Sequence, residues 1–419
     1  MLTPGPPPSV RLRWGLSRHA RRLITLALAG LVIAVITRRA EFAGVAAPAV
    51  LLLVTWHQDR PASVSLEVHL TATRFIEGEQ ATVIAELGGV GDHTVQMQLR
   101  PAYMITAAAP VPAGATAFRL PFRAERYGRR QVGELDIILT DRWHLMEGRV
   151  MTRVPEVTCL PAPVRHDQRI VLSKLPSRLG EHSARTQGDG FEFAGIREFV
   201  PGDRQRRINW PATTRRGTLQ LNTFAAERAQ NVVVMVDATS DVGEPGSSSL
   251  VLGLRAAAGA ARSYLAARDR VGLVLYGGSQ SWISPAAGRR QFDRIMDTML
   301  NARASWTRAS ELARLPRAAL PPGALIMVFS PLLNPMLTET LRGLRERGLT
   351  VLIVDVLNAE PEPGERTAAR LAQRVWRMEQ QAIRFSLREL GIPVVHWDGK
   401  QSLDEPLAPY TRRVMVTHR

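Results

Sequence analysis

The chain has 419 residues, of which 45% are hydrophobic and 22% are charged, and its formal net charge is +16. This composition excludes an intrinsically disordered chain, and the length is sufficient for two or three domains. The single cysteine, Cys159, excludes an internal disulfide and fits a reducing compartment. The excess of arginine leaves two classes of anionic partner open, lipid and nucleic acid.

The chain begins with a basic segment, residues 1–22, and two uncharged apolar segments follow it at 23–37 and 42–56. Each is shorter than the roughly 20 residues that span a bilayer. Flanking arginines and Trp56 can lengthen the span by lying at the interface. We therefore predict a hairpin of two transmembrane helices over 23–56. A buried hairpin in a soluble domain and a signal peptide are the alternatives.

The charges around these segments predict their orientation. Five arginines precede the first apolar segment, at positions 11, 13, 18, 21 and 22, whereas two arginines and one glutamate lie between the segments. The positive-inside rule then places the N-terminus in the cytoplasm. Two crossings return the chain to that side, so the soluble domains are also predicted to be cytoplasmic.

Residues 61–163 show alternating apolar and polar positions, as in Val64, Leu66 and Val68. Turn-forming residues interrupt this pattern at intervals of about ten residues, which is typical of short antiparallel strands. We predict a small antiparallel β-sandwich-like domain. Its histidines are isolated, and no pair has the spacing of metal ligands.

A dense polar stretch, IREFVPGDRQRRINW, lies in the next region, 164–229. Asp203 follows a Pro-Gly turn and can cap a short helix. Helical spacing would place Asp203, Arg206 and Trp210 on one face, and Pro211 would end the turn. Three interpretations remain open: a structural cluster that locks the β domain to the C-terminal sheet, a partner-binding surface, and a catalytic site. The last lacks a nucleophile with a base partner.

Residues 230–400 alternate continuous apolar strands with helical segments, and 401–419 follow as a C-terminal tail. This pattern predicts an α/β domain with a doubly wound, mostly parallel sheet. Ligands bind beyond the carboxyl ends of the strands in such sheets. Asp237, Ser330 and Asp355 are predicted at those ends.

The order of these segments and the polar stretch resemble the bacterial domain-of-unknown-function 58 family. Matching signature residues include Arg197, Glu198, Pro201, Gly202, Asp203, Arg206, Trp210 and Arg215. Upstream, TDRWHLMEG resembles the family's Asp-x-aromatic-Gly-Leu turn, with His144 in place of the glycine. The resemblance implies a von Willebrand factor type A-like (Rossmann-like) C-terminal domain.

A working domain of that type holds Mg²⁺ through an Asp-x-Ser-x-Ser loop, a distant threonine and a further aspartate. The positions that correspond here are Asp237, Thr239, Asp241 and Thr307, and Pro331 stands where the further aspartate is expected. Mg²⁺ needs near-octahedral oxygen ligands, so each missing ligand weakens the site. We predict weak or absent Mg²⁺ binding and no other cofactor.

The resemblance implies a membrane-tethered assembly module that works with a MoxR-type AAA+ ATPase on cell-envelope or metal-dependent client proteins. One alternative is nucleic-acid binding through the arginines of the polar stretch, but few aromatic residues interleave them. The other is a metal-dependent hydrolase. The chain contains no phosphate loop, HExxH or GxSxG motif, so no catalytic residue is predicted.

Overall fold

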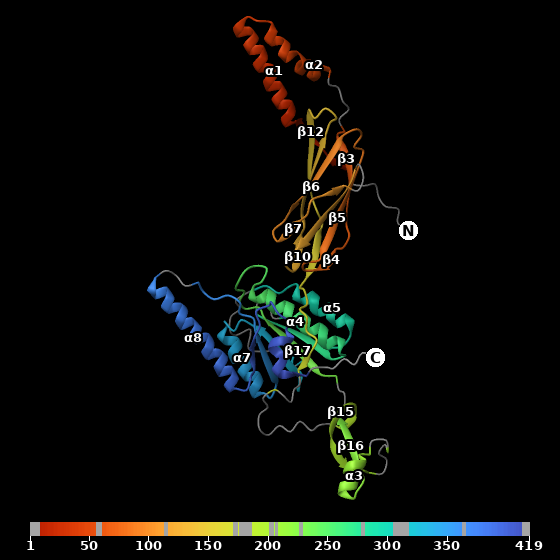
Figure 1. Ribbon diagram of the computed structural model, residues 1–419, viewed down its shortest axis with the longest axis vertical. Helices are drawn as coiled ribbons and strands as arrows, with labels where there is room; N and C mark the ends of the chain where they lie inside the picture. Colours follow the sequence, from red (N-terminus) through yellow and green to blue (C-terminus); the bar gives the residue numbers. More distant parts are fainter. Residues whose placement is uncertain are drawn as a thin grey trace. The chain divides into compact units, whose positions relative to one another are not determined.

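Figure 1 shows the computed structural model of the chain. The structure describes residues 9–55, 61–112, 116–170, 175, 187–200, 205, 208–225, 229–277, 281–304, 318–362 and 366–412. The chain divides into two compact units, Met1–Ala162 and Pro163–Arg419.

Two helices and two layers of strands make up the N-terminal unit. The helices are α1 (Arg18–Thr37) and α2 (Glu41–Thr55). One sheet has the order β1-β3-β5-β9-β7, with β8 also on β9, and the second has the order β2-β12-β11-β6. The strands of the first sheet are β1 (Ser9–Arg11), β3 (Ser63–Leu70), β5 (Gln80–Gly88), β7 (Ile105–Ala107), β8 (Val111–Pro112) and β9 (Ala117–Ala124). Those of the second are β2 (Arg13–Leu16), β6 (Thr94–Pro101), β11 (Gly133–Thr140) and β12 (Met146–Arg153).

The predicted alternation places one face of each sheet in a shared core. Leu120 and Phe122 of β9 and Leu135 and Ile137 of β11 are all buried in a single cluster. A third, three-stranded sheet joins β10 (Gly128–Gln131), β13 (Glu156–Leu160) and β4 (Arg74–Ile76). Cys159 of β13 is buried in the same core, which makes it a packing residue.

The sequence did not predict the strands that precede α1. β1 pairs with β3 and β2 pairs with β12, both in antiparallel register. Residues 9–16 therefore belong to the β domain, although α1 and α2 separate them from the rest of it in the sequence.

Small residues let α1 and α2 approach closely. A Cβ atom on Gly30 would lie 3.3 Å from the Phe42 carbonyl oxygen, and Ala27 and Ala46 are buried against each other. Among the described helices, α1 is the one long and apolar enough to cross a membrane. α2 has 15 residues, fewer than a span of roughly 20, so the predicted pair of crossings stays a prediction.

A six-stranded sheet forms the centre of the C-terminal unit, in the order β19-β18-β17-β20-β21-β22. Its strands are β17 (Asn231–Asp237), β18 (Arg270–Tyr276), β19 (Ser281–Ala286), β20 (Leu325–Ser330), β21 (Thr350–Asp355) and β22 (Val394–His396). All neighbours are parallel except β18 and β19. The mixed α/β class and the antiparallel sheets are thus confirmed, and the sequence missed the antiparallel edge strand β19.

Helices cover both faces of this sheet (Figure 1). They are α4 (Ser249–Ala266), α5 (Arg289–Met299), α7 (Pro335–Glu346) and α8 (Thr367–Glu389). α4 contacts β17, β18, β20 and α5, whereas Leu337 and Leu341 of α7 and Leu387 of α8 pack with Val233 and Met235 on the other face. Because both faces are covered, the strands are apolar throughout.

The segments at the two ends of this unit pair with each other. β14 (Arg169–Ile170) forms an antiparallel bridge with β23 (Thr411–Arg412). The short helix α9 (Asp404–Leu407) and the 3₁₀ turn η3 (Ala408–Tyr410) lie just before β23. Part of the predicted tail, 401–419, is therefore integral to the fold.

Candidate functional site

The predicted metal ligand Asp237 ends β17, at the point where the strand order reverses between β17 and β20. Its side chain is fully buried. Oδ1 accepts hydrogen bonds from Thr239 N at 2.9 Å and Thr239 Oγ1 at 2.6 Å, and Oδ2 accepts one from Ser330 Oγ at 2.6 Å. Burial raises the pKa of Asp237, and the hydrogen bonds from Ser330 and Thr239 oppose that rise.

Asp241, the second predicted metal position in this loop, contacts the start of α4. Its Oδ1 accepts a hydrogen bond from Leu250 N, at 3.2 Å, in the first turn of α4. The carboxylate therefore caps this helix, whose formal N-cap residue, Ser248, makes no side-chain capping bond. The sequence predicted Asp241 as a metal ligand. Its capping bond could not be predicted, because that bond depends on where α4 begins.

The described residues bring Asp237, Thr239 and Ser330 together, and the hydroxyls of Thr239 and Ser330 both donate to the Asp237 carboxylate. Thr307 lies outside the described residues. Leu332 N donates to Ser330 Oγ at 2.9 Å, with Leu332 in a left-handed conformation. In the described part of the chain, no cluster of three His, Cys, Asp or Glu side chains could hold a metal ion. Weak or absent Mg²⁺ binding stays a prediction.

A second polar group lies at the ends of β21 and β22. Asp355 is fully buried, and Arg384 Nε of α8 donates to its Oδ2 at 2.7 Å. His396 Nδ1 lies 3.8 Å from the same oxygen, and the interaction with Asp355 raises the pKa of His396. A cleft of about 700 Å³ adjoins both basic residues. The sequence placed Asp355 at a strand end, but its partners come from distant segments.

The signature region forms a β-hairpin and a short helix. β15 (Gln187–Glu198) pairs with β16 (Gln220–Ala225), and α3 spans Trp210–Arg216. Asn209 caps α3 by accepting from Ala212 N, at 3.0 Å, and Gly217 ends it with φ of 72°. The capping bond and the left-handed φ explain why an asparagine and a glycine flank the helix.

One expectation about this region is wrong. Pro211 lies in the first turn of α3, where proline is tolerated, and does not end a helical turn. Trp210 is 65% exposed, and its predicted neighbours Asp203 and Arg206 lie outside the described residues. Of the other signature residues, Arg197 and Glu198 end β15, and Arg215 lies in the last turn of α3. Four signature residues lie outside the described part of the chain: Pro201, Gly202, Asp203 and Arg206.

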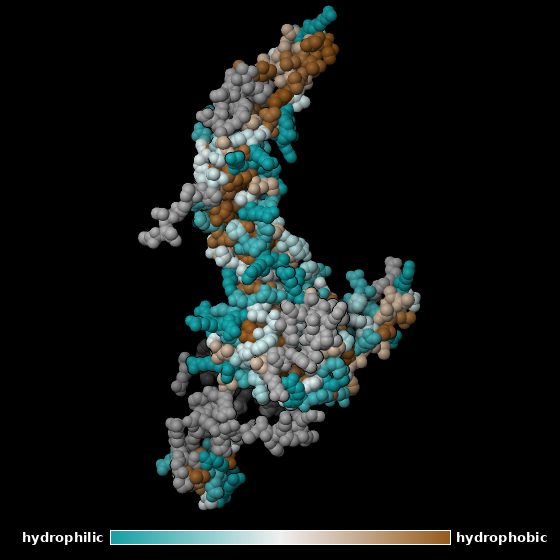
Figure 2. All heavy atoms as spheres, turned by 180° about the vertical axis from the view of Figure 1, so that it is seen from behind, coloured by the Kyte–Doolittle hydropathy of each residue, from teal (hydrophilic) through white to brown (hydrophobic). Residues whose placement is uncertain are grey.

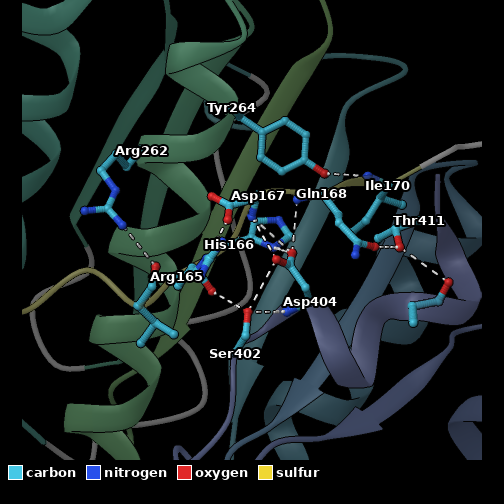
Figure 3. A network of polar contacts seen from close by, with 12 residues as sticks. Arg165, His166, Asp167, Gln168, Ile170, Arg262, Tyr264, Ser402, Asp404 and Thr411 are labelled. Atoms are coloured by element: carbon cyan, nitrogen blue, oxygen red, sulfur yellow. Dashed lines mark hydrogen bonds and ion pairs between the residues drawn. The ribbon is translucent and has the colours of Figure 1, made fainter. Parts of the chain in front are cut away.

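A third polar network holds the segment that follows Ala162 (Figure 3). The His166 side chain is fully buried, and its Nδ1 lies 2.8 Å from Asp404 Oδ1. Asp167 N and Gln168 N also donate to the Asp404 carboxylate, at 3.0 Å each. Although burial opposes it, these hydrogen bonds lower the pKa of Asp404 to about 2. Sequence reasoning missed this pair, because its members are 238 positions apart.

Residues 195–368 match the model of the family described as Protein of unknown function DUF58. The matched range begins in β15, includes the sheet strands β17 to β21, and ends at the start of α8. The match confirms, for the residues that it covers, the resemblance to this family predicted from the sequence. The comparison with curated proteins found no match.

Proposed function

We propose that the chain is a membrane-tethered protein-interaction module with a von Willebrand A-like domain, which works with a MoxR-type AAA+ ATPase on client proteins. The order of the central sheet is that of doubly wound nucleotide-binding folds, with one antiparallel edge strand. The first strand ends in Asp237, as in a domain of that type. The hydrogen bonds that surround Asp237 favour a module without a working metal and without catalysis.

The apolar side chains of α1 support membrane tethering. Leu26, Leu28, Val35 and Ile36 are 56–78% exposed, and the hairpin is largely hydrophobic in Figure 2. Exposing such a surface to water is unfavourable by roughly 25 cal/mol per Å² of apolar area. A bilayer removes this cost.

The strands before α1 support an even number of crossings. β1 and β2 must lie on the same side of the membrane as β3 and β12, because they share hydrogen bonds with them. If α1 crosses the membrane, α2 must therefore cross it in the opposite direction. Since α2 has 15 residues, residues that flank it would have to complete the span of roughly 20. A cleaved signal peptide is disfavoured, because removing it would take two strands out of the β domain.

The observation that carries the interaction function is an apolar seam on α8. We define the α8 seam as Leu371, Val375, Met378, Ala382 and Phe385, which recur with alternate spacings of four and three residues. The four large members are 53–64% exposed. The side chains at the opposite face, such as Gln380 and Leu387, are buried against the domain. A seam with this period fits the side chains of another helix.

The charges beside the seam support a partner of complementary charge. Helical spacing places Arg370, Arg374, Arg377 and Arg388 along one flank of the α8 seam. Arg377 pairs with Glu360. The partner element is therefore proposed to be an amphipathic helix with acidic residues on one flank.

The test is capture of partners from native bacterial membranes with the full-length protein as bait. We expect a MoxR-type AAA+ ATPase in the wild-type eluate and a loss of at least tenfold with M378E/F385E. Y103E is the matched control, because Tyr103 is an apolar side chain that is 71% exposed on the β domain. It should capture as much as the wild type.

Equal capture by wild type and M378E/F385E would contradict a role for the α8 seam. Absence of any AAA+ ATPase from the wild-type eluate would contradict the proposed partner. Retention on DNA with a steep dependence on salt would favour nucleic-acid binding instead, and ester or phosphoester turnover that is lost in D237A would favour a hydrolase.

A further inference from the structure

A cleft of about 510 Å³ lies where α1 leaves the β domain. Charged and aromatic side chains dominate its lining: Arg18, His19, Arg22, Trp143, His144 and Glu147. Ser17 anchors the start of α1 beside it, since Ser17 N donates to Leu145 O at 2.9 Å and Ser17 Oγ donates to His144 O at 2.5 Å. The helix and the sheet therefore keep the walls of the cleft in a defined position.

The basic groups in this cleft are placed to bind an anion. Arg18 and Arg22 lie one helical turn apart on the same face of α1, and the first turn of α1 contains no acidic residue. Glu147 is the single acidic residue in the lining. Guanidinium groups bind phosphate oxygens with paired, charge-assisted hydrogen bonds.

The same face of α1 becomes apolar beyond the cleft. Leu26, Ile33 and Ile36 continue the line of Arg18 and Arg22 at helical spacing, and they are 56%, 44% and 75% exposed. The buried small residues of α1 lie on a different face, against α2. Two arginines followed by an apolar stripe match the shape of a lipid. Its headgroup would lie at the arginines, and its acyl chain would lie along the apolar residues.

Trp143 adds the side chain typical of a membrane interface. It is 48% exposed, and the Arg142 guanidinium lies 5.0 Å from its ring centroid. Tryptophan gathers at headgroup level in membrane proteins because its ring is apolar and its N–H is polar. The cleft therefore lies where headgroups would be if α1 spans the bilayer.

We propose that this cleft binds the phosphate of an anionic phospholipid through Arg18 and Arg22, with the acyl chain along Leu26, Ile33 and Ile36. The proposal rests on the membrane tethering proposed above. A specific lipid bound here would hold the base of α1 against the β domain at the membrane surface.

The test uses the full-length protein in a mild non-ionic detergent, with fluorescent phosphatidylglycerol and fluorescent phosphatidylcholine as probes. We expect the wild type to bind the anionic lipid about tenfold more tightly, the effect of roughly one charge-assisted hydrogen bond. R18Q/R22Q should lose this preference. R38Q/R39Q is the matched control, since it removes two arginines at the other end of α1, and it should keep the preference. If R18Q/R22Q does not fold, R22Q alone should lose at least about threefold.

An unchanged preference in R18Q/R22Q, or an equal loss in both double variants, would overturn the proposal. Competition by glycerol phosphate as strong as that by the lipid would identify a site for soluble phosphate instead and would overturn it too. Membrane pelleting after alkaline carbonate extraction separates the two proposals. A wild type that does not pellet contradicts tethering, whereas a wild type that pellets without lipid preference contradicts only the lipid site.

Discussion

His144 shows how one residue carries strain in a tight turn. Its φ of 57° lies in the left-handed region, at the position where the sequence resemblance predicts a glycine. The turn is held by Asp141 Oδ1, which accepts from Leu145 N at 2.7 Å and Met146 N at 2.9 Å. The backbone conformation therefore persists without the glycine that would adopt it freely.

We predict that H144V lowers the free energy of unfolding by about 1–2 kcal/mol, because a β-branched residue resists a left-handed conformation. H144G should leave stability equal or raise it by up to about 1 kcal/mol. Chemical denaturation of the full-length protein in detergent measures both. H69V is the control on an exposed position of β3, and a loss with H144V no larger than with H69V would contradict the prediction.

The Asp404 network predicts a dependence of stability on pH. Because hydrogen bonds lower the folded-state pKa of Asp404 to about 2, the carboxylate stabilises the fold fully above its unfolded pKa of about 3.9. That contribution is lost as pH falls from about 4 to about 2. Thermal melts should show D404N less stable than the wild type at pH 6, with the difference shrinking below pH 4. A constant difference across this range would contradict the assignment.

The hydrogen bonds of Asp237 predict the outcome of a metal titration. Both of its oxygens already accept from Thr239 and Ser330, and Asp241 caps α4. Mg²⁺ would have to replace these bonds and complete an octahedral shell. Titration calorimetry should therefore show no micromolar Mg²⁺ or Mn²⁺ site, and such a site, if lost in D237A, would show the prediction wrong.

At the scale of elements, the contact between α4 and the segment that follows Ala162 depends on one glycine. A Cβ atom on Gly259 would lie 2.3 Å from the Val164 carbonyl oxygen. Val164 N donates to Arg255 O of α4 at 3.1 Å. The missing side chain therefore allows the chain to lie against the helix.

This contact predicts opposite effects for two glycine-to-alanine changes in helices. G343A in α7 should raise the free energy of unfolding by about 1 kcal/mol, since a Cβ there meets no atom within 4 Å and alanine favours helix. G259A should lower it despite the same helix propensity, because the backbone of Val164 must move. Equal gains from both variants, measured by thermal melting, would contradict the close packing.

At the scale of the whole molecule, the strand pairings and the arginine distribution predict one topology. If the proposed hairpin crosses the membrane, the β domain and the residues before α1 are expected on one side of it, and the positive-inside rule predicts that this side is cytoplasmic. A protease site inserted at 113–115, between β8 and β9, should stay uncut in intact cells and be cut after lysis. Cleavage in intact cells would contradict this orientation.

The sequence by itself predicted the elements with strong local patterns. Alternating residues revealed the antiparallel strands of the β domain, and continuous apolar runs revealed β17, β20 and β21. The arginine-rich signature indicated the resemblance to the DUF58 family. These signals are local, because side-chain periodicity follows directly from the geometry of each element.

Only the tertiary structure decided the contacts between distant segments. The pairing of β1 and β2 across the helices, the Asp404 bond to His166, and the exposure of the α8 seam all depend on which segments become neighbours. Trp210 and Asp241 illustrate the same limit: a sequence pattern predicts a residue's position within an element, but its partners come from the packing of the chain. The physical reason is that burial and hydrogen-bond pairing are properties of the assembled fold, whereas periodicity belongs to each segment alone.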